Sequence, residues 1–162
     1  MNPFHGCILY RARRNVRYHC MEIHPKTKEA YMATRLKGKA EFFHCEICGN
    51  LTYRIDEGPG TMTCCGKDMV LLKANSTDGA REKHVPVVAV EGPVMTVRVG
   101  EIAHPMEDGH HIAWIFVAGN DVDTLVKLAV DGSPEAMVTA NLADVVSVYA
   151  YCNLHGLFEV NV

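Results

Sequence analysis

The stretch CEICGN at residues 45–50 holds the pair Cys45 and Cys48, and CCG at residues 64–66 adds Cys64 and Cys65. Paired cysteines followed by glycine are typical of a tight loop that presents two thiolates to one metal ion, because glycine lets backbone amides turn toward the sulfurs. Consecutive side chains tend to point apart, so we expect the adjacent pair to distort the tetrahedral site. Four-cysteine sites hold structural zinc more often than iron, but an adjacent pair departs from the usual zinc spacing.

A second group of metal-binding residue types combines imidazoles with a thiolate. Its members are His84, His104, His110, Cys152 and His155. This mixture suits redox chemistry on iron. A lone histidine is more often an ordinary surface or core residue, and Cys152 alone would be a small buried hydrophobe. Coincidence is a poor explanation for all five, so the sequence indicates two metal sites in one chain.

Composition narrows the class of protein further. The 162 residues are 48% hydrophobic, enough for one ordinary domain or two small ones. No apolar run is long enough to span a bilayer, and no apolar segment follows the N-terminal arginines, so we predict a cytoplasmic protein without a membrane anchor. The net charge of -3 argues against nucleic acid as a partner. Seven cysteines, an odd number, favour metal ligation over disulfides.

The chain divides into three parts. Residues 1–31 are polar and basic without a sustained period, and their scattered cysteines and histidines lack a familiar ligand spacing. Codons for residues 28–30 can form a ribosome-binding sequence, so we predict Met32 as the true start, with a short basic arm as the alternative. Residues 37–74 form a small turn-rich unit that needs its metal for stability. The polar run at 75–79 is a linker.

The third part, residues 80–162, is predicted to be a β-sandwich. Short β-rich segments alternate there with turn residues, a pattern typical of two packed antiparallel sheets, and little helix is expected. The segments are 85–90, 94–99, 112–118, 124–130, 145–151 and 158–162. The second group of ligands lies at strand ends and in loops of this domain, where a rigid scaffold holds them and leaves one face open to solvent.

Six motifs together resemble the desulfoferrodoxins, the two-iron form of superoxide reductase. They are CEICGN at 45–50, CCGKDM at 64–69, EKHVPV at 82–87, HPMEDGH at 104–110, IAWI at 112–115 and CNLHGLF at 152–158. The resemblance implies a desulforedoxin-like domain, followed by an immunoglobulin-like sandwich. It also implies two irons per chain. The first is bound by Cys45, Cys48, Cys64 and Cys65, and the second by equatorial His84, His104, His110 and His155 with axial Cys152.

The resemblance also implies a reaction. An axial thiolate favours reduction of a ligand opposite it, so superoxide would take one electron and two protons to become hydrogen peroxide, without release of oxygen. Lys83 matches the lysine that steers the anion, and Glu82 matches the glutamate that binds ferric iron. A small redox protein such as rubredoxin is the implied electron donor, and a homodimer is the implied assembly.

Two points stay open at the level of sequence. His110 and His111 are adjacent and compete for one ligand role. Spacing from His104 favours His110, so His111 is expected at the surface or beside the site. His44 is expected to be exposed. The alternative functions are an iron electron-transfer or redox-sensing protein, and a zinc-stabilised interaction module. Lys83 and the CNLHG motif favour the enzyme, because neither alternative needs them.

Overall fold

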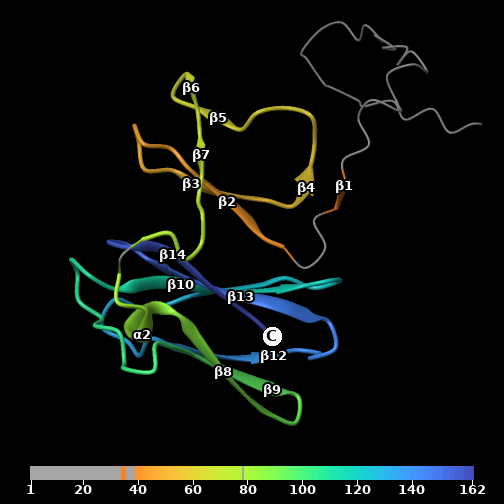
Figure 1. Cartoon of the computed structure of the whole chain (residues 1–162), viewed down its shortest axis with the longest axis vertical. Helices are drawn as coiled ribbons and strands as arrows, with labels where there is room; N and C mark the ends of the chain where they lie inside the picture. Colours follow the sequence, from red (N-terminus) through yellow and green to blue (C-terminus); the bar gives the residue numbers. More distant parts are fainter. Residues whose placement is uncertain (1–33, 36–38, 78) are drawn as a thin grey trace, which may run out of the picture. The chain divides into compact units, whose positions relative to one another are not determined.

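The computed structural model describes residues 34–35, 39–77 and 79–162, which consist mainly of β-strands (Figure 1). Within these ranges no helix is both long and apolar enough to cross a membrane. The predictions made for residues 1–31, including a start at Met32, fall outside the described residues.

The small unit that carries Cys45, Cys48, Cys64 and Cys65, which we call the tetrathiolate unit, is built from very short strands. Its central sheet has the order β3-β2-β7, a hairpin joins β5 to β6, and β1 pairs with β4. The bounds are β1 Thr34–Arg35, β2 Glu41–His44, β3 Leu51–Arg54, β4 Asp56–Glu57, β5 Thr63–Cys64, β6 Lys67–Asp68 and β7 Val70–Leu71. Its own apolar cluster is small: among the described residues it has three buried members, Phe43, Cys45 and Met69. So small a core leaves the unit dependent on its metal, since short chains bury too little apolar surface to fold alone.

Two antiparallel sheets form the sandwich and lie one over the other (Figure 1). One has the order β11-β10-β13-β14 and the other β12-β9-β8. The bounds are β8 Pro86–Glu91, β9 Val94–Val99, β10 Ile112–Gly119, β11 Thr124–Lys127, β12 Glu135–Thr139, β13 Val145–Cys152 and β14 Gly156–Asn161. Alternation along β9 buries Met95, Val97 and Val99 completely against the inner face of the other sheet. The predicted β-sandwich is thus confirmed.

The structure corrects several details of the predictions, including the start of β14, which lies at Gly156 rather than at residue 158. Strand β12 was missed because Glu135–Thr139 directly follows a predicted turn, and its alternation of exposed and buried residues spans only five positions at a sheet edge. Strand β11 ends at Lys127 rather than at residue 130. A single helical turn, α2 (Arg81–His84), lies where no helix was expected. His44 is only partly exposed, because it lies in β2.

An aromatic cluster joins the tetrathiolate unit to the sandwich. The ring of Phe42, on β2, lies 4.7 Å from that of Trp114 and 5.2 Å from that of Phe116, both on β10. Tyr53 on β3 packs against Phe116 at 4.8 Å. Aromatic pairs at such distances stabilise a contact beyond the area that they bury. The two predicted parts of the chain therefore share a packed boundary.

Candidate metal centres

The first candidate centre gathers four free cysteines at two turns of the small unit. One sulfur from each of Cys45, Cys48, Cys64 and Cys65 lies within 4.8 Å of all the others. The Sγ of Cys64 lies 3.6 Å from that of Cys48 and 3.9 Å from that of Cys65. Sulfurs bound at about 2.3 Å around a tetrahedral ion are about 3.8 Å apart. The separations therefore fit a single four-coordinate metal.

Backbone conformation explains how adjacent cysteines serve one ion. The β5–β6 hairpin turns through Cys65 and Gly66, whose φ angles are 52° and 74°. Positive φ at both central residues is the requirement of a type I′ turn, and it re-aims the side chain of Cys65 relative to an extended strand. A non-glycine residue in this region carries a strain of about 1–3 kcal/mol. Positive φ at Cys65 therefore helps two adjacent thiols to face one ion, while the distortion of the tetrahedron stays a prediction.

Hydrogen bonds shift the pKa values of these thiols in opposite directions. Backbone N–H groups of Cys48 and Ile47 lower the pKa of Cys45 to about 7, because they stabilise its thiolate. Hydrogen bonds with the Cys48 and Cys64 side chains raise the pKa of Cys65 to about 12. One ligand ionises near neutral pH and the last resists ionisation among its neighbours. A bound cation removes this conflict, since it stabilises all four thiolates.

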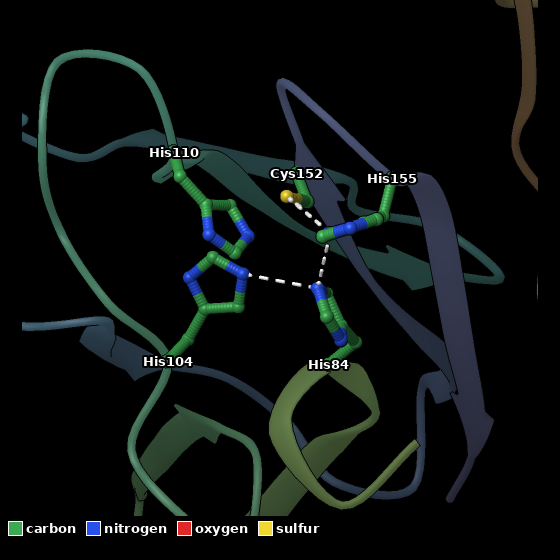
Figure 2. A group of neighbouring side chains, drawn as sticks. All are labelled: His84, His104, His110, Cys152 and His155. Carbon is green, nitrogen blue, oxygen red and sulfur yellow. Dashed lines mark hydrogen bonds between the residues drawn. The ribbon is translucent and has the colours of Figure 1, made fainter. Parts of the chain in front are cut away.

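The second candidate centre lies at one end of the sandwich (Figure 2). Helix α2 ends with His84, the loop between β9 and β10 carries His104 and His110, and strand β13 ends with Cys152 immediately before the turn that carries His155. One ligand atom from each of these five residues lies within 4.8 Å of all the others. His84, His104 and Cys152 are almost fully buried.

Hydrogen bonds fix which nitrogen of each buried imidazole faces the centre. The Nδ1–H of His84 donates to the carbonyl of Ala80 at 2.8 Å, and that of His104 donates to the carbonyl of Pro105 at 2.6 Å. Both Nε2 atoms are left with lone pairs, 3.1 Å apart (Figure 2). Two nitrogens bound at about 2.1 Å and at right angles lie about 3.0 Å apart. A metal between them converts a repulsive contact into a bonding one.

The remaining ligands complete the same arrangement. Nδ1 of His155 lies 2.9 Å from Nε2 of His84 and 3.6 Å from the sulfur of Cys152. Nε2 of His110 is buried and has no hydrogen-bond partner among the described residues. A buried polar atom without a partner costs free energy unless something satisfies it. The donor set therefore fits a metal with four nitrogen ligands and one sulfur ligand.

Electrostatics keep these imidazoles ready for a metal. Burial lowers the pKa of His104 to about 4 and also lowers the pKa values of His84 and His110, because an imidazolium is poorly solvated there. Metal ions bind the neutral ring, so no proton has to be displaced at neutral pH. The positive charge of Lys83 makes a smaller contribution to the lowered pKa of His110.

The structure places the other predicted site residues around this centre. Glu82 and Lys83 are exposed on α2. His111 lies outside the ligand group, and its Nδ1 contacts the carbonyl of Glu107 at 3.1 Å. The turn after β9 supports α2, because the N–H of Ile102 donates to the carbonyl of Glu82 in the helix at 3.0 Å. The N–H of Gly100 donates to the carbonyl of Val85, directly after the helix, at 3.1 Å.

Several residues that hold the ligands were missed at the level of sequence. Thr77 donates from its hydroxyl to the carbonyl of His155 at 2.8 Å, and Gly79 packs so closely that a Cβ there would lie 3.3 Å from Cβ of His155. Asn153 bonds to the loop of His110. Thr77 and Gly79 were assigned to a linker, and Asn153 to a turn within the CNLHGLF motif. Only their proximity in sequence to ligands could have marked them as positioning residues.

Fold and sites together define a mainly β protein with a tetrathiolate centre in a small unit and a four-histidine, one-cysteine centre in a sandwich. Family models agree: Desulfoferrodoxin matches residues 76–161, and Desulfoferrodoxin, N-terminal domain, matches residues 38–72. The chain belongs to the desulfoferrodoxin family. Because both domains of this iron-binding family are present with their ligand groups, the chain is a two-site iron protein.

The matches with individual relatives cover most of the length of each relative. A desulfoferrodoxin homolog of Methanothermobacter thermautotrophicus is 42% identical over 118 residues, 73% of this chain and 95% of the relative. A desulfoferrodoxin of Nitratidesulfovibrio vulgaris is 41% identical over 116 residues, 72% of this chain and 91% of the relative. The crystal structure of the superoxide reductase from Treponema pallidum is similar with a TM-score of 0.64 and 32% identity, covering 76% of this chain and 98% of that one.

Proposed function

We propose that this chain is a superoxide reductase, in which His84, His104, His110, His155 and Cys152 bind the catalytic iron and Cys45, Cys48, Cys64 and Cys65 bind a second iron. The observation that carries the proposal is the convergence of four imidazoles and one buried thiolate at the solvent-facing end of a rigid sandwich. Ferrous iron held by these residues would supply the single electron that, with two protons, converts superoxide to hydrogen peroxide. Similarity to the Treponema pallidum enzyme supports this assignment.

The protein groups have distinct parts in the proposed reaction. Neutral imidazoles hold the metal without adding charge, while Cys152 adds one negative charge from the buried side. Five protein ligands would leave a six-coordinate metal open to one small anion. Lys83 raises the local concentration of superoxide, and its ammonium is exposed without an ion-pair partner in the described part of the chain. We assign Glu82, its exposed neighbour on α2, as a carboxylate that would bind the metal in its oxidised state.

Partners and location complete the proposal. We propose that a small redox protein such as rubredoxin supplies electrons and that two copies of the chain form a homodimer. Cys48 and Cys65 are exposed, which favours electron entry near the tetrathiolate centre. The free thiols of both ligand sets require a reducing compartment, which supports a cytoplasmic address. Superoxide as a small substrate needs no nucleic acid or membrane partner.

The deciding experiment combines metal content with reaction products. Protein purified without added metal should contain two irons per chain, and in the reduced state it should consume superoxide with formation of peroxide and without release of oxygen. One iron with one zinc would keep the enzyme and leave the tetrathiolate centre structural. Zinc alone, after expression with iron supplied, would refute the enzyme and favour the interaction module. Oxygen release would instead identify a dismutase.

A further inference from the structure

His110 belongs to the mixed centre, the site of four histidines and one cysteine, and it lies in the loop between β9 and β10, outside any strand. The loop between β9 and β10 is closed at this point by reciprocal backbone hydrogen bonds between Glu107 and His110, each 3.0 Å long. The rings of His84 and His104 are each anchored through Nδ1 to a carbonyl. Nε2 of His110 is buried without a partner among the described residues. The position of this imidazole therefore depends on how its backbone is held.

One side chain holds that backbone on both sides of His110. The Oδ1 of Asn153 accepts the N–H of His111 at 2.8 Å, and its Nδ2 donates to the carbonyl of Gly109 at 3.2 Å. In addition, the backbone N–H of Asn153 donates to the carbonyl of His111 at 3.1 Å. Three hydrogen bonds thus connect the residue that follows Cys152 to the two residues that flank His110.

We propose that Asn153 is a positioning residue of the mixed centre, which fixes the imidazole of His110 relative to the sulfur of Cys152. The proposal rests on the ligand set given under the proposed function. Asn153 follows Cys152 directly and lies where the β10–β13 ladder ends at the pair Ile112 and Cys152. Its side chain extends that connection to a loop that no strand stabilises. The strand that carries the thiolate and the loop that carries the imidazole then move as one body.

The chemistry of the two contacts requires a carboxamide. One partner is an N–H and the other a carbonyl, so the side chain must accept and donate at once, which asparagine does through its two terminal atoms. Aspartate keeps the acceptor for His111 but places a second oxygen against the carbonyl of Gly109. Alanine removes both contacts and leaves the backbone bond in place. N153D therefore tests the contact with Gly109 alone, and the difference between N153D and N153A measures the contact with His111.

The experiment uses the full-length, iron-loaded chain and compares N153A and N153D with wild type. Iron retention is measured by chelator competition with elemental analysis, and the electron paramagnetic resonance signal of each ferric site reports its own ligand geometry. We expect N153A to weaken iron binding at the mixed centre by about 10- to 100-fold, as is typical when residues that orient metal ligands are changed. N153D should fall between N153A and wild type. The tetrathiolate signal should not change.

A matched control separates positioning from folding. Asn141 is exposed in the turn before β13, at the opposite end of that strand from the metal centre, and its Oδ1 also accepts a backbone N–H, that of Ala143. N141A should leave both iron sites intact. Iron retention and spectrum of N153A equal to those of wild type would overturn the proposal, as would a loss in N153A that N141A shares or that affects both centres together. N153D equal to wild type would overturn the two-sided contact. A wild-type chain without iron at the mixed centre would overturn the ligand set itself.

Discussion

The two metal centres of this chain are built in opposite ways. The tetrathiolate centre lies among two-residue strands and tight turns, with Cys48 and Cys65 exposed and a core of three residues beneath it. The mixed centre lies at the ends of long strands, with His84, His104 and Cys152 buried. Backbone carbonyls orient its imidazoles before a metal arrives. The tetrathiolate region therefore needs a bound metal for its stability, whereas the sandwich positions two of its ligands without one.

The largest expected effect comes from Cys152, the proposed thiolate ligand of the mixed centre. Cys152→Ala removes a charged ligand that is completely buried, so superoxide reduction should fall by more than about 100-fold, beyond the usual loss for a residue that only orients a ligand. Superoxide consumption and iron per chain measure the effect. The tetrathiolate spectrum of the same sample is the internal control. Activity within a few-fold of wild type would show that the thiolate is not part of the reacting site.

Next in size is the close contact that supports α2. Gly100 has a φ of 86°, and a Cβ there would lie 2.7 Å from the carbonyl carbon and oxygen of Lys83 and 2.4 Å from the carbonyl oxygen of Ile102. Gly100→Ala should lower the free energy of unfolding by about 2–4 kcal/mol, from positive-φ strain together with overpacking. Thermal and denaturant unfolding measure this loss. The helix carries three predicted site residues, so activity should decline as well.

A substitution at Gly92 separates the cost of backbone strain from the cost of the close contact at Gly100. Gly92 also has a positive φ, 60°, but a Cβ there meets nothing within 4 Å. Gly92→Ala should therefore cost about 1 kcal/mol and leave activity unchanged. Equal losses in the two variants would mean that backbone strain explains the whole effect and that the contact beneath α2 has no part in holding the site.

The sequence was sufficient for the residue types of both centres and for the sandwich, because these leave strong local signals. Cysteine pairs with glycine mark tight metal loops, and strict alternation in β9 marks a half-buried strand. The features that the sequence did not predict depend on contacts between residues far apart in the chain. Strand β12 is recognisable only beside β9, and α2 is a single turn that gains its support from Gly100 across the chain. The role of Asn153 depends on a loop some 40 residues earlier, which no window of sequence contains.

A smaller effect is expected from the exposed charge beside the mixed centre. Lys83→Ala should lower the second-order rate constant for superoxide by about 10-fold at low ionic strength, because a cation near an open site attracts anions. The difference from wild type should shrink as salt is added, since screening shortens the range of the field. Stopped-flow or pulse-radiolysis kinetics at several salt concentrations measure both quantities.

The position of the charge, and not the net charge, is what this variant tests. Lys127→Ala removes an equal charge from an exposed position on β11 and should change the rate constant by less than about 2-fold. Lys83→Arg should retain most of the rate, because the cation is kept. An equal decline in Lys83→Ala and Lys127→Ala would remove Lys83 from the proposed site and leave only a general attraction by the whole molecule.

The smallest expected effect on catalysis is also the sharpest test of the comparison between the two centres. Cys48→Ser removes one exposed ligand of the tetrathiolate centre, so that centre should lose its iron and the segment around residues 41–71 should become sensitive to protease, since its few buried residues cannot hold it alone. The mixed centre has its own anchors at Ala80 and Pro105. Superoxide reduction by a chemically reduced variant should therefore stay within about 2-fold of wild type. A larger loss would mean that unfolding of the tetrathiolate unit also disturbs the mixed centre, through the aromatic cluster around Phe42. If the loss appeared only with a protein electron donor, the tetrathiolate iron would instead be the point at which electrons enter the chain.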